Sequence, residues 1–274
     1  MLSEKHGKGR ENTMYTKQNL KEHLRAMGLK PEDAVMMHSS MKAIGEVEGG
    51  ADTVLDALME YFEPGLLMLP THTWAQMNPE YNVFDPATEP ACVGILPNLF
   101  MKRPGVVRSL HPTHSIAAYG PGAAEYVAGE ENCTSPCPKG GCWERLRGIG
   151  AKILLVGVTH ARNTYIHAVE EYLDVPERLA EKPSYFTVIM PDGTGKEVIQ
   201  YRHYNVKEPH VSEHFVKLHD GYLETGAAVS VRFGDAKCLL CDCDAIYRVT
   251  ERVLAHEINC FLDREEIPPQ WWRA

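Results

Sequence analysis

The sequence predicts a protein of the α/β class: a three-layer α/β/α sandwich whose central sheet is mainly parallel, with a small antiparallel addition. Helix and strand patterns alternate from residue 17 to residue 70, which is typical of a parallel sheet joined by helices. The strand patterns are short and apolar, so we expect the strands to be buried. Of the 274 residues, 44% are apolar, which is enough for a substantial core.

The first expected element is a helix over residues 17–27. Leu20 and Leu24 share one of its faces, Thr16 can cap its start, and Gly28 ends it. The next elements are a strand, a helix and a strand. They are expected at residues 34–38, 51–62 and 66–69.

The second half of the chain adds further strands and helices and one hairpin. The hairpin is indicated by Pro191-Asp-Gly-Thr-Gly195, because an Asp-Gly step between two strand patterns favours a tight turn. Strands are expected at residues 153–158, 185–190, 197–201, 227–233 and 238–241, and helices at residues 163–173, 212–222 and 244–262. Residues 71–112 show little periodicity, so we expect a binding surface there.

The two ends of the chain suggest a single domain with a short polar extension. Residues 1–15 are polar and predict a disordered lead-in. No repeat, low-complexity tract or linker interrupts the remainder, so residues 16–274 are expected to form a single domain.

The charge balance excludes some function classes. With 28 basic and 37 acidic side chains the net charge is −9, whereas a nucleic-acid binder needs a basic face. No apolar run approaches the roughly 18 residues of a membrane span, and residues 1–13 hold no apolar signal segment. We therefore expect a soluble, cytoplasmic protein with no nucleic-acid or membrane partner. The acidic balance is compatible with a cationic small-molecule substrate.

Eight cysteines lie mostly in two groups, Cys133-x3-Cys137-x4-Cys142 and Cys238-x2-Cys241-x-Cys243. Without a recognised secretion signal, a disulfide framework is not expected. Both spacings differ from the paired two-residue knuckles of structural zinc sites. We expect reduced thiols in core and loops and no bound metal, with a structural zinc as the alternative.

Two polar clusters follow predicted strands, at the edge where α/β sheets bind ligands. His38-Ser39-Ser40 offers hydroxyl and backbone donors to an anion such as a pyrophosphate. The second cluster spans Arg108 to Ser115. Its guanidinium is a candidate anion clamp, and His111 is a candidate for proton transfer or positioning.

The third cluster is Asn163-Thr-Tyr-Ile-His-Ala-Val-Glu-Glu171, at the start of a predicted helix. His167 falls in the first helical turn, where the helix dipole favours the neutral imidazole that a general base needs. Glu170 and Glu171 lie on the same side of the helix, and a carboxylate raises the pKa of a neighbouring histidine. The two effects together predict a base that titrates near neutrality.

These clusters, with several shorter motifs, resemble the aminoglycoside 3-N-acetyltransferase family, which is distinct from the common GNAT acetyltransferases. The similar segments occur in the family's order over about residues 17–262. They are Met37-His-Ser-Ser-Met-Lys-Ala-Ile-Gly45, Leu69-Pro-Thr-His-Thr-Trp74, Phe84-Asp-Pro-Ala-Thr88, Arg108-Ser-Leu-His-Pro-Thr-His-Ser115 and Asn163-Thr-Tyr-Ile-His-Ala-Val-Glu170. The two cysteine groups are departures from the family's usual pattern.

The resemblance implies an α/β/α fold and an acetyl-CoA-dependent N-acetyltransferase, which passes acetyl directly to an amine of an aminoglycoside or related amino compound in a ternary complex. It implies that His167 is the base and Glu170 its partner, with His111 the next catalytic candidate. The implied cofactor-binding residues are His38, Ser39, Ser40, Met41, Arg108 and Ser115. The candidates for the acceptor side are Thr71, which could also donate to an oxyanion, Asp85 and Glu171. A cationic amine is the expected partner, and a homodimer is compatible with the sequence.

Two alternatives from other classes remain open at the sequence level. A metal-dependent hydrolase would use His and Cys ligands such as His210 and His214, four residues apart on a predicted helix. A non-catalytic protein would bind CoA or another small molecule through the cluster around Arg108 and show no turnover.

Overall fold

The computed structural model describes residues 14–273. The expected lead-in falls almost wholly on residues 1–13, which lie outside the described residues. Tyr15 forms a parallel bridge to Val47, and the Tyr15 backbone exchanges hydrogen bonds with Glu46 and Glu48, so the folded chain includes residue 15.

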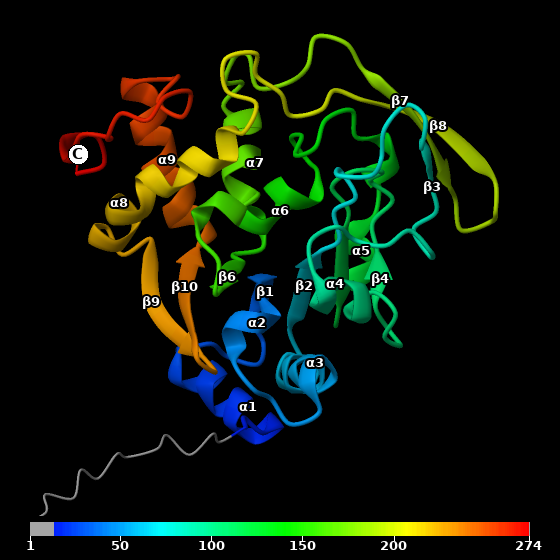
Figure 1. The fold of residues 1–274 in the computed structure, drawn as a ribbon, viewed down its shortest axis with the longest axis vertical. Helices are drawn as coiled ribbons and strands as arrows, with labels where there is room; N and C mark the ends of the chain where they lie inside the picture. The colour runs from blue at the N-terminus through cyan, green and yellow to red at the C-terminus, as the bar shows by residue number, and fades with distance from the viewer. Residues whose placement is uncertain (1–13, 274) are drawn as a thin grey trace, which may run out of the picture.

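A seven-stranded sheet forms the centre of the described chain (Figure 1). In spatial order its strands are β4 (Val107–Arg108), β5 (Ile116–Tyr119), β2 (Leu66–Pro70), β1 (Ala34–Ser39), β6 (Lys152–Val156), β10 (Ala236–Asp242) and β9 (Ala228–Phe233). Strand β1 pairs in parallel with β2 and with β6. The four other neighbouring pairs are antiparallel. The expected α/β class is confirmed, but the sheet is mixed rather than mainly parallel.

The chain connections explain why the sheet is mixed. A parallel pair needs a long crossover, whereas β9 and β10 are joined by Gly234 and Asp235 and can pair only as a hairpin. Gly234 has a φ of +60°, and a Cβ there would lie 2.2 Å from the carbonyl oxygen of Ile44. The close turn therefore requires glycine.

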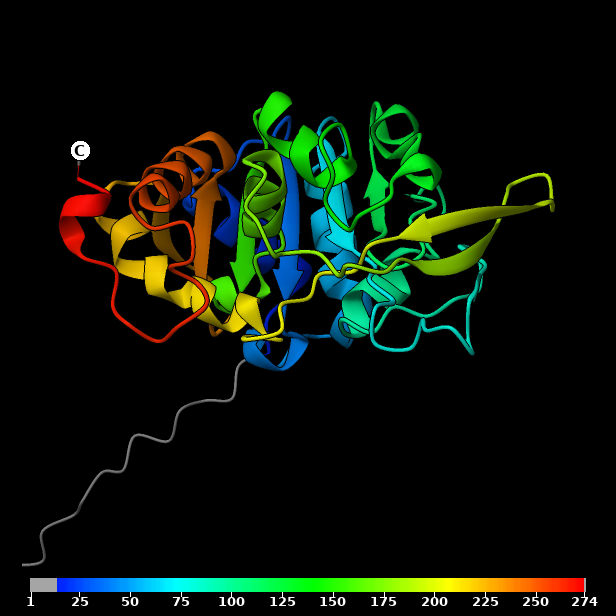
Figure 2. The same cartoon turned by 90° about the horizontal axis from the view of Figure 1, so that it is seen from above.

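Helices cover both faces of this sheet, so the expected three layers are present (Figure 2). Side chains alternate along each strand: Val35 and Met37 belong to one buried cluster and Met36 to the other. The first cluster packs against α1 (Lys17–Ala26), α2 (Met41–Ile44), α3 (Gly50–Tyr61) and α4 (Ile95–Phe100). The second packs against α5 (Ala123–Val127), α6 (Cys142–Gly148), α7 (Tyr165–Tyr172), α8 (His219–Glu224) and α9 (Cys243–His256).

A second, three-stranded sheet lies at one side of the molecule (Figure 1). Its strands are β3 (Val83–Phe84), β7 (Ser184–Ile189) and β8 (Gly195–Gln200). Strands β7 and β8 form the predicted antiparallel hairpin, and β3 pairs in parallel with β7. Residues 201–210 then lead from β8 back across the molecule to the 3-10 helix η3 (Val211–Leu218).

Two expected helices differ in extent. The helix expected over residues 212–222 is divided into η3 and α8, and the one expected over 244–262 ends at His256. None of the helices within residues 14–273 is long and apolar enough to cross a membrane.

Candidate active site

A cavity of about 540 Å³ opens where the central parallel strands end. His38 and Ser39 close strand β1, Pro70 closes β2, and the segment after β6 adds residues 158–167 to the wall. Segments 202–204 and 209–212 complete it. This is the edge at which α/β sheets bind their ligands.

His167 lies in this wall, and its ring is bonded to Glu170, which is in turn paired with Arg178. Its Nδ1 is 3.1 Å from Oε2 of Glu170, one turn later on α7. The Nε of Arg178 donates to the other carboxylate oxygen at 2.6 Å. Glu170 and Arg178 are 1% and 4% exposed, so the pair is shielded from solvent. Since Nδ1 faces Glu170, the Nε2 of His167 is the ring nitrogen left for a ligand.

Burial lowers the pKa of His167 below its ordinary value of 6.5, and the neighbouring His203 lowers it further. The hydrogen bond to Glu170 acts in the opposite direction and raises this pKa. His167 is therefore neutral at pH 7, with a pKa lowered from the near-neutral titration that the sequence predicts. The main cause is burial, however, rather than the helix dipole.

Four histidines from separate segments surround this position, and we call them the histidine cluster: His72, His114, His167 and His203. The rings of His167 and His203 stack with centroids 4.1 Å apart. His114 lies 5.4 Å from His203 and 4.7 Å from His72. Burial and the mutual repulsion of the rings lower the pKa of His72 and His114 well below 6.5.

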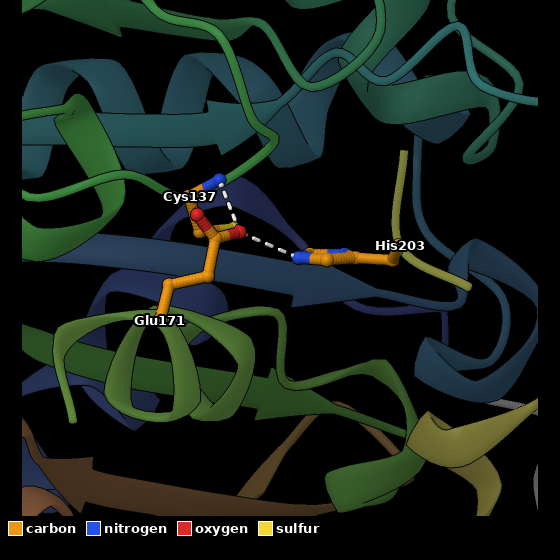
Figure 3. Close-up of side chains that lie close together, drawn as sticks. All are labelled: Cys137, Glu171 and His203. Atoms are coloured by element: carbon orange, nitrogen blue, oxygen red, sulfur yellow. Dashed lines mark hydrogen bonds and ion pairs between the residues drawn. The ribbon is translucent and has the colours of Figure 1, made fainter. Parts of the chain in front are cut away.

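Glu171 is bonded to His203 (Figure 3) and does not line the cavity. Its Oε1 accepts from Nε2 of His203 at 2.7 Å and from the backbone N–H of Cys137 at 2.9 Å. Its Oε2 accepts from the Ser135 hydroxyl. The expected role of Glu171 in binding the acceptor is therefore not supported by its position, because donors from the protein already surround it.

One ligand-type atom each of Cys137, Glu171 and His203 lies within 4.8 Å of the others, which makes them the group within residues 14–273 that could hold a metal ion. Burial raises the pKa of the Cys137 thiol well above 9, so the thiol is protonated in this protein. His210 and His214, the ligands expected for a metal-dependent hydrolase, do not belong to this group. His214 bonds Glu208 at 3.0 Å, and His210 lines the cavity.

The expected cofactor-binding residues separate into two sets. His38 and Ser39 line the cavity, whereas Ser40 and Met41 do not. Burial lowers the pKa of His38 to about 3, so the ring is neutral.

Arg108 does not line the cavity, and its guanidinium forms hydrogen bonds with the backbone of neighbouring loops. It donates to the carbonyl oxygens of Thr71, Pro86 and Glu89 at 2.8, 3.1 and 2.6 Å. Its Nε also donates to the hydroxyls of Thr71 and Ser115, which bond each other at 2.9 Å. These contacts join the loops that follow β2, β3 and β4. They do not leave a guanidinium free to clamp an anion.

His111 and Asp85 are likewise engaged in hydrogen bonds within the protein. His111 is fully buried, with Nε2 3.0 Å from the Ser135 carbonyl oxygen and Nδ1 accepting from the backbone N–H of His114 at 3.0 Å. Asp85 caps its own turn by accepting from Ala87 and Thr88. Neither residue lines the cavity.

Three buried polar atoms of the cavity wall have no hydrogen-bond partner in the described residues: Nε2 of His38, Nδ1 of His72 and Oδ1 of Asn163. Buried polar atoms are normally paired, because desolvation without a partner is costly. Their presence at one wall indicates a ligand with its own donors and acceptors.

The sequence did not single out His203, Arg178 or Arg202, which the structure places at the cavity. No local motif surrounds them. His203 meets Glu171 across 32 residues of chain, and Arg178 follows Glu170 only after the end of α7. The one sequence signal for Arg178 is that a buried Glu170 needs a later arginine as its partner, and such pairs have no fixed spacing in the sequence.

All eight cysteines are free, and six of them are buried. Cys238 and Cys241 belong to opposite faces of the sheet, as the strand periodicity predicts, whereas Cys243 lies beyond the strand and begins helix α9.

Comparison with known proteins identifies the family to which the chain belongs. A family model described as "Aminoglycoside 3-N-acetyltransferase" matches residues 36–255. The chain belongs to this family. The resemblance drawn from the sequence motifs is thereby confirmed, and the matched residues include His167, Glu170 and Arg178.

Among curated members of the aminoglycoside 3-N-acetyltransferase family, the chain is similar to aminoglycoside N(3)-acetyltransferase III of Acinetobacter baumannii. The two are 32% identical over 182 residues, which is 60% of this chain and 63% of the relative. Aminoglycoside N(3)-acetyltransferase VII of Streptomyces paromomycinus is 33% identical over 180 residues, 59% and 62% of the two chains. The match thus spans less than two thirds of these relatives.

Solved structures of the family share the fold. Aminoglycoside acetyltransferase AAC(3)-IVa in complex with a gentamicin has a TM-score of 0.79 at 23% identity, covering 96% of this chain and 95% of that one. AAC-IIIb in a binary complex with CoASH has a TM-score of 0.74 at 24% identity, covering 86% and 94%.

Proposed function

We propose that this protein is an acetyl-CoA-dependent N-acetyltransferase that passes acetyl directly to the amine of an aminoglycoside or related amino compound, with His167 as general base. Membership of the aminoglycoside 3-N-acetyltransferase family supports the reaction class. The observation that carries the proposal is the buried chain Arg178–Glu170–His167, which ends with a neutral imidazole at the cavity wall.

Residues of this protein can accept the proton that the amine loses in this reaction. An amine is protonated at pH 7 and has to lose a proton before it can attack. The Nε2 of His167 accepts that proton, and Glu170 stabilises the resulting imidazolium through Nδ1. Arg178 fixes Glu170 from the other side, so the base is held in one orientation.

The cavity suits acetyl-CoA, whose thioester supplies the acetyl group when bound. Ser39 at the end of β1 offers a hydroxyl, and the unpaired Nε2 of His38 and Oδ1 of Asn163 lie at the same wall. Ser39, which lines the cavity, is a suitable donor to the oxyanion formed in the reaction. Thr71 lies outside the cavity lining, and its hydroxyl is bonded to Ser115.

The direct test is release of CoA thiol from acetyl-CoA in the presence of a panel of amines that includes aminoglycosides. We expect turnover with at least one amine, and a higher melting temperature when CoA is added. His167→Ala should lower turnover by about 10²–10⁴-fold while the thermal shift by CoA persists. No thiol release with any amine, or wild-type turnover in His167→Ala, would contradict the proposal.

A further inference from the structure

Within the described residues, the wall of the cavity holds arginines and no carboxylate, although the chain as a whole is acidic. Six histidines and three arginines line it, and none of the aspartates or glutamates within residues 14–273 does. The full chain nevertheless carries a net charge of −9. Four carboxylates close in sequence to this wall are already paired: Glu170 with Arg178, Glu171 with His203, Glu208 with His214, and Glu213 with Arg162. A polycation entering this cavity would meet no carboxylate at its wall.

Arg202 differs from the other two arginines of the wall. Arg178 is paired with Glu170 and Arg162 with Glu213. Arg202 donates instead to the backbone carbonyl oxygens of Trp74 and Met77, at 2.6 and 3.3 Å, and no carboxylate of the described residues pairs with it. It is half-buried, and burial lowers its pKa from 12.5. The guanidinium stays charged at neutral pH, and two of its five N–H donors are used.

Arg202 lines the same cavity as His167. It directly precedes His203, whose ring stacks on His167. Arg162, by contrast, belongs to η2 (His160–Arg162) and is paired with Glu213, and His210 directly precedes η3. A ligand that reaches Nε2 of His167 therefore shares the cavity with the guanidinium of Arg202.

We infer that the acceptor is an amine that also carries an oxyanion, a carboxylate or a phosphate, and that Arg202 binds this oxyanion while the amine faces His167. The inference rests on the proposed acetyl transfer. A guanidinium matches both oxyanions through paired N–H donors. Two fixed carbonyl contacts hold its fork in place before the ligand arrives.

Matched amine pairs test the inference with the native protein. Thiol release is measured with β-alanine against β-alaninamide, with phosphoethanolamine against ethanolamine, and with gentamicin. We expect kcat/KM to be about 10- to 100-fold higher for the oxyanion-bearing member of at least one pair, the usual value of a hydrogen bond to a charged group. The pair that shows the preference identifies the oxyanion.

Variants then assign the preference to Arg202. Arg202→Gln should reduce the ratio of kcat/KM within the preferred pair by about tenfold or more, and Arg202→Lys should restore part of it. Arg248→Gln removes an equal charge from an exposed position on α9 and should leave the ratio unchanged. The thermal shift by CoA checks that each variant is folded.

The outcomes separate this inference from the proposed function. No turnover with any amine would contradict the acetyl transfer itself. Turnover that favours the member without an oxyanion in both pairs, or gentamicin over all of them, would leave the transfer standing and overturn the role of Arg202. A change in KM for acetyl-CoA with an unchanged acceptor ratio in Arg202→Gln would likewise overturn it.

Discussion

At the scale of single residues, the site shows how burial sets the chemistry of a histidine. His167 is bonded to a carboxylate, which by itself raises its pKa, yet burial and the stacked His203 lower it below 6.5. The sequence predicts the pair and its spacing, because three residues along a helix bring side chains together. It does not predict the sign of the net pKa shift, because the ring that stacks on His167 comes from a segment 36 residues later.

The pH dependence of the reaction should report this sign. We expect kcat/KM to rise with pH on an acid limb whose midpoint lies below 6.5, since only the neutral imidazole accepts a proton. His167→Ala should remove the limb along with most of the rate. Glu170→Gln should move the limb to lower pH, because the hydrogen bond that raises the pKa of His167 is weakened. It should also lower the melting temperature, because Arg178 loses its buried partner. An acid limb at or above pH 6.5 in the native protein would contradict this assignment.

At the scale of elements, local patterns predict the longer helices and strands, but they miss the short elements α2, α4, α5, α6, β3, β4 and β5 and do not determine the loops. Apolar periodicity and a capping box at Thr16 define α1, and the Asp-Gly turn defines the β7–β8 hairpin. The loop around Arg108 illustrates the opposite case. A guanidinium among hydroxyls is the same pattern whether it binds a ligand or backbone carbonyls, and only the folded chain shows that Arg108 binds the carbonyls.

Replacement of Arg108 distinguishes the two interpretations. If it joins the loops after β2, β3 and β4, Arg108→Met should lower the free energy of unfolding by about 1–3 kcal/mol, because buried carbonyl oxygens lose their donors. The dissociation constant for CoA, measured at a temperature where the variant is folded, should change by less than about threefold. Arg103→Met, which removes surface pairs with Asp52 and Asp56, is the matched control and should cost about 1 kcal/mol or less. A large loss of CoA affinity with unchanged stability would instead support an anion clamp.

At the scale of the whole molecule, the sheet brings distant polar segments to one edge. The sequence predicts that residues after β1, β2 and β6 meet there, because these strands are parallel. The cluster at residues 108–115 is also expected at this edge, but the sequence does not predict that the 201–210 segment joins them, since that segment is placed by tertiary packing. The consequence is a concentration of neutral, buried histidines at one site, which makes the stability of the fold depend on pH.

Mild acid should therefore destabilise the protein before its carboxylates are protonated. Burial lowers the pKa of His38 and His160 to about 3 in the folded protein, and it also lowers those of His72, His111, His114 and His167. Unfolded histidines titrate near 6.5, so below this pH the unfolded state binds more protons than the folded state, and stability falls as pH falls.

Each histidine that is protonated only in the unfolded state should contribute about 1.4 kcal/mol per pH unit to this fall. Urea unfolding at pH 7.5, 6.5 and 5.5 measures it, and the loss should begin near pH 6.5. Carboxylates with lowered pKa values, such as Glu60 and Glu224, add to the loss only below about pH 4.5, so this interval isolates the histidines. His160→Gln removes one buried imidazole that does not line the cavity and should make the dependence shallower. Equal stability at pH 7.5 and 5.5 would show that the buried rings are protonated in the folded protein, and neutral histidines could then not explain the site.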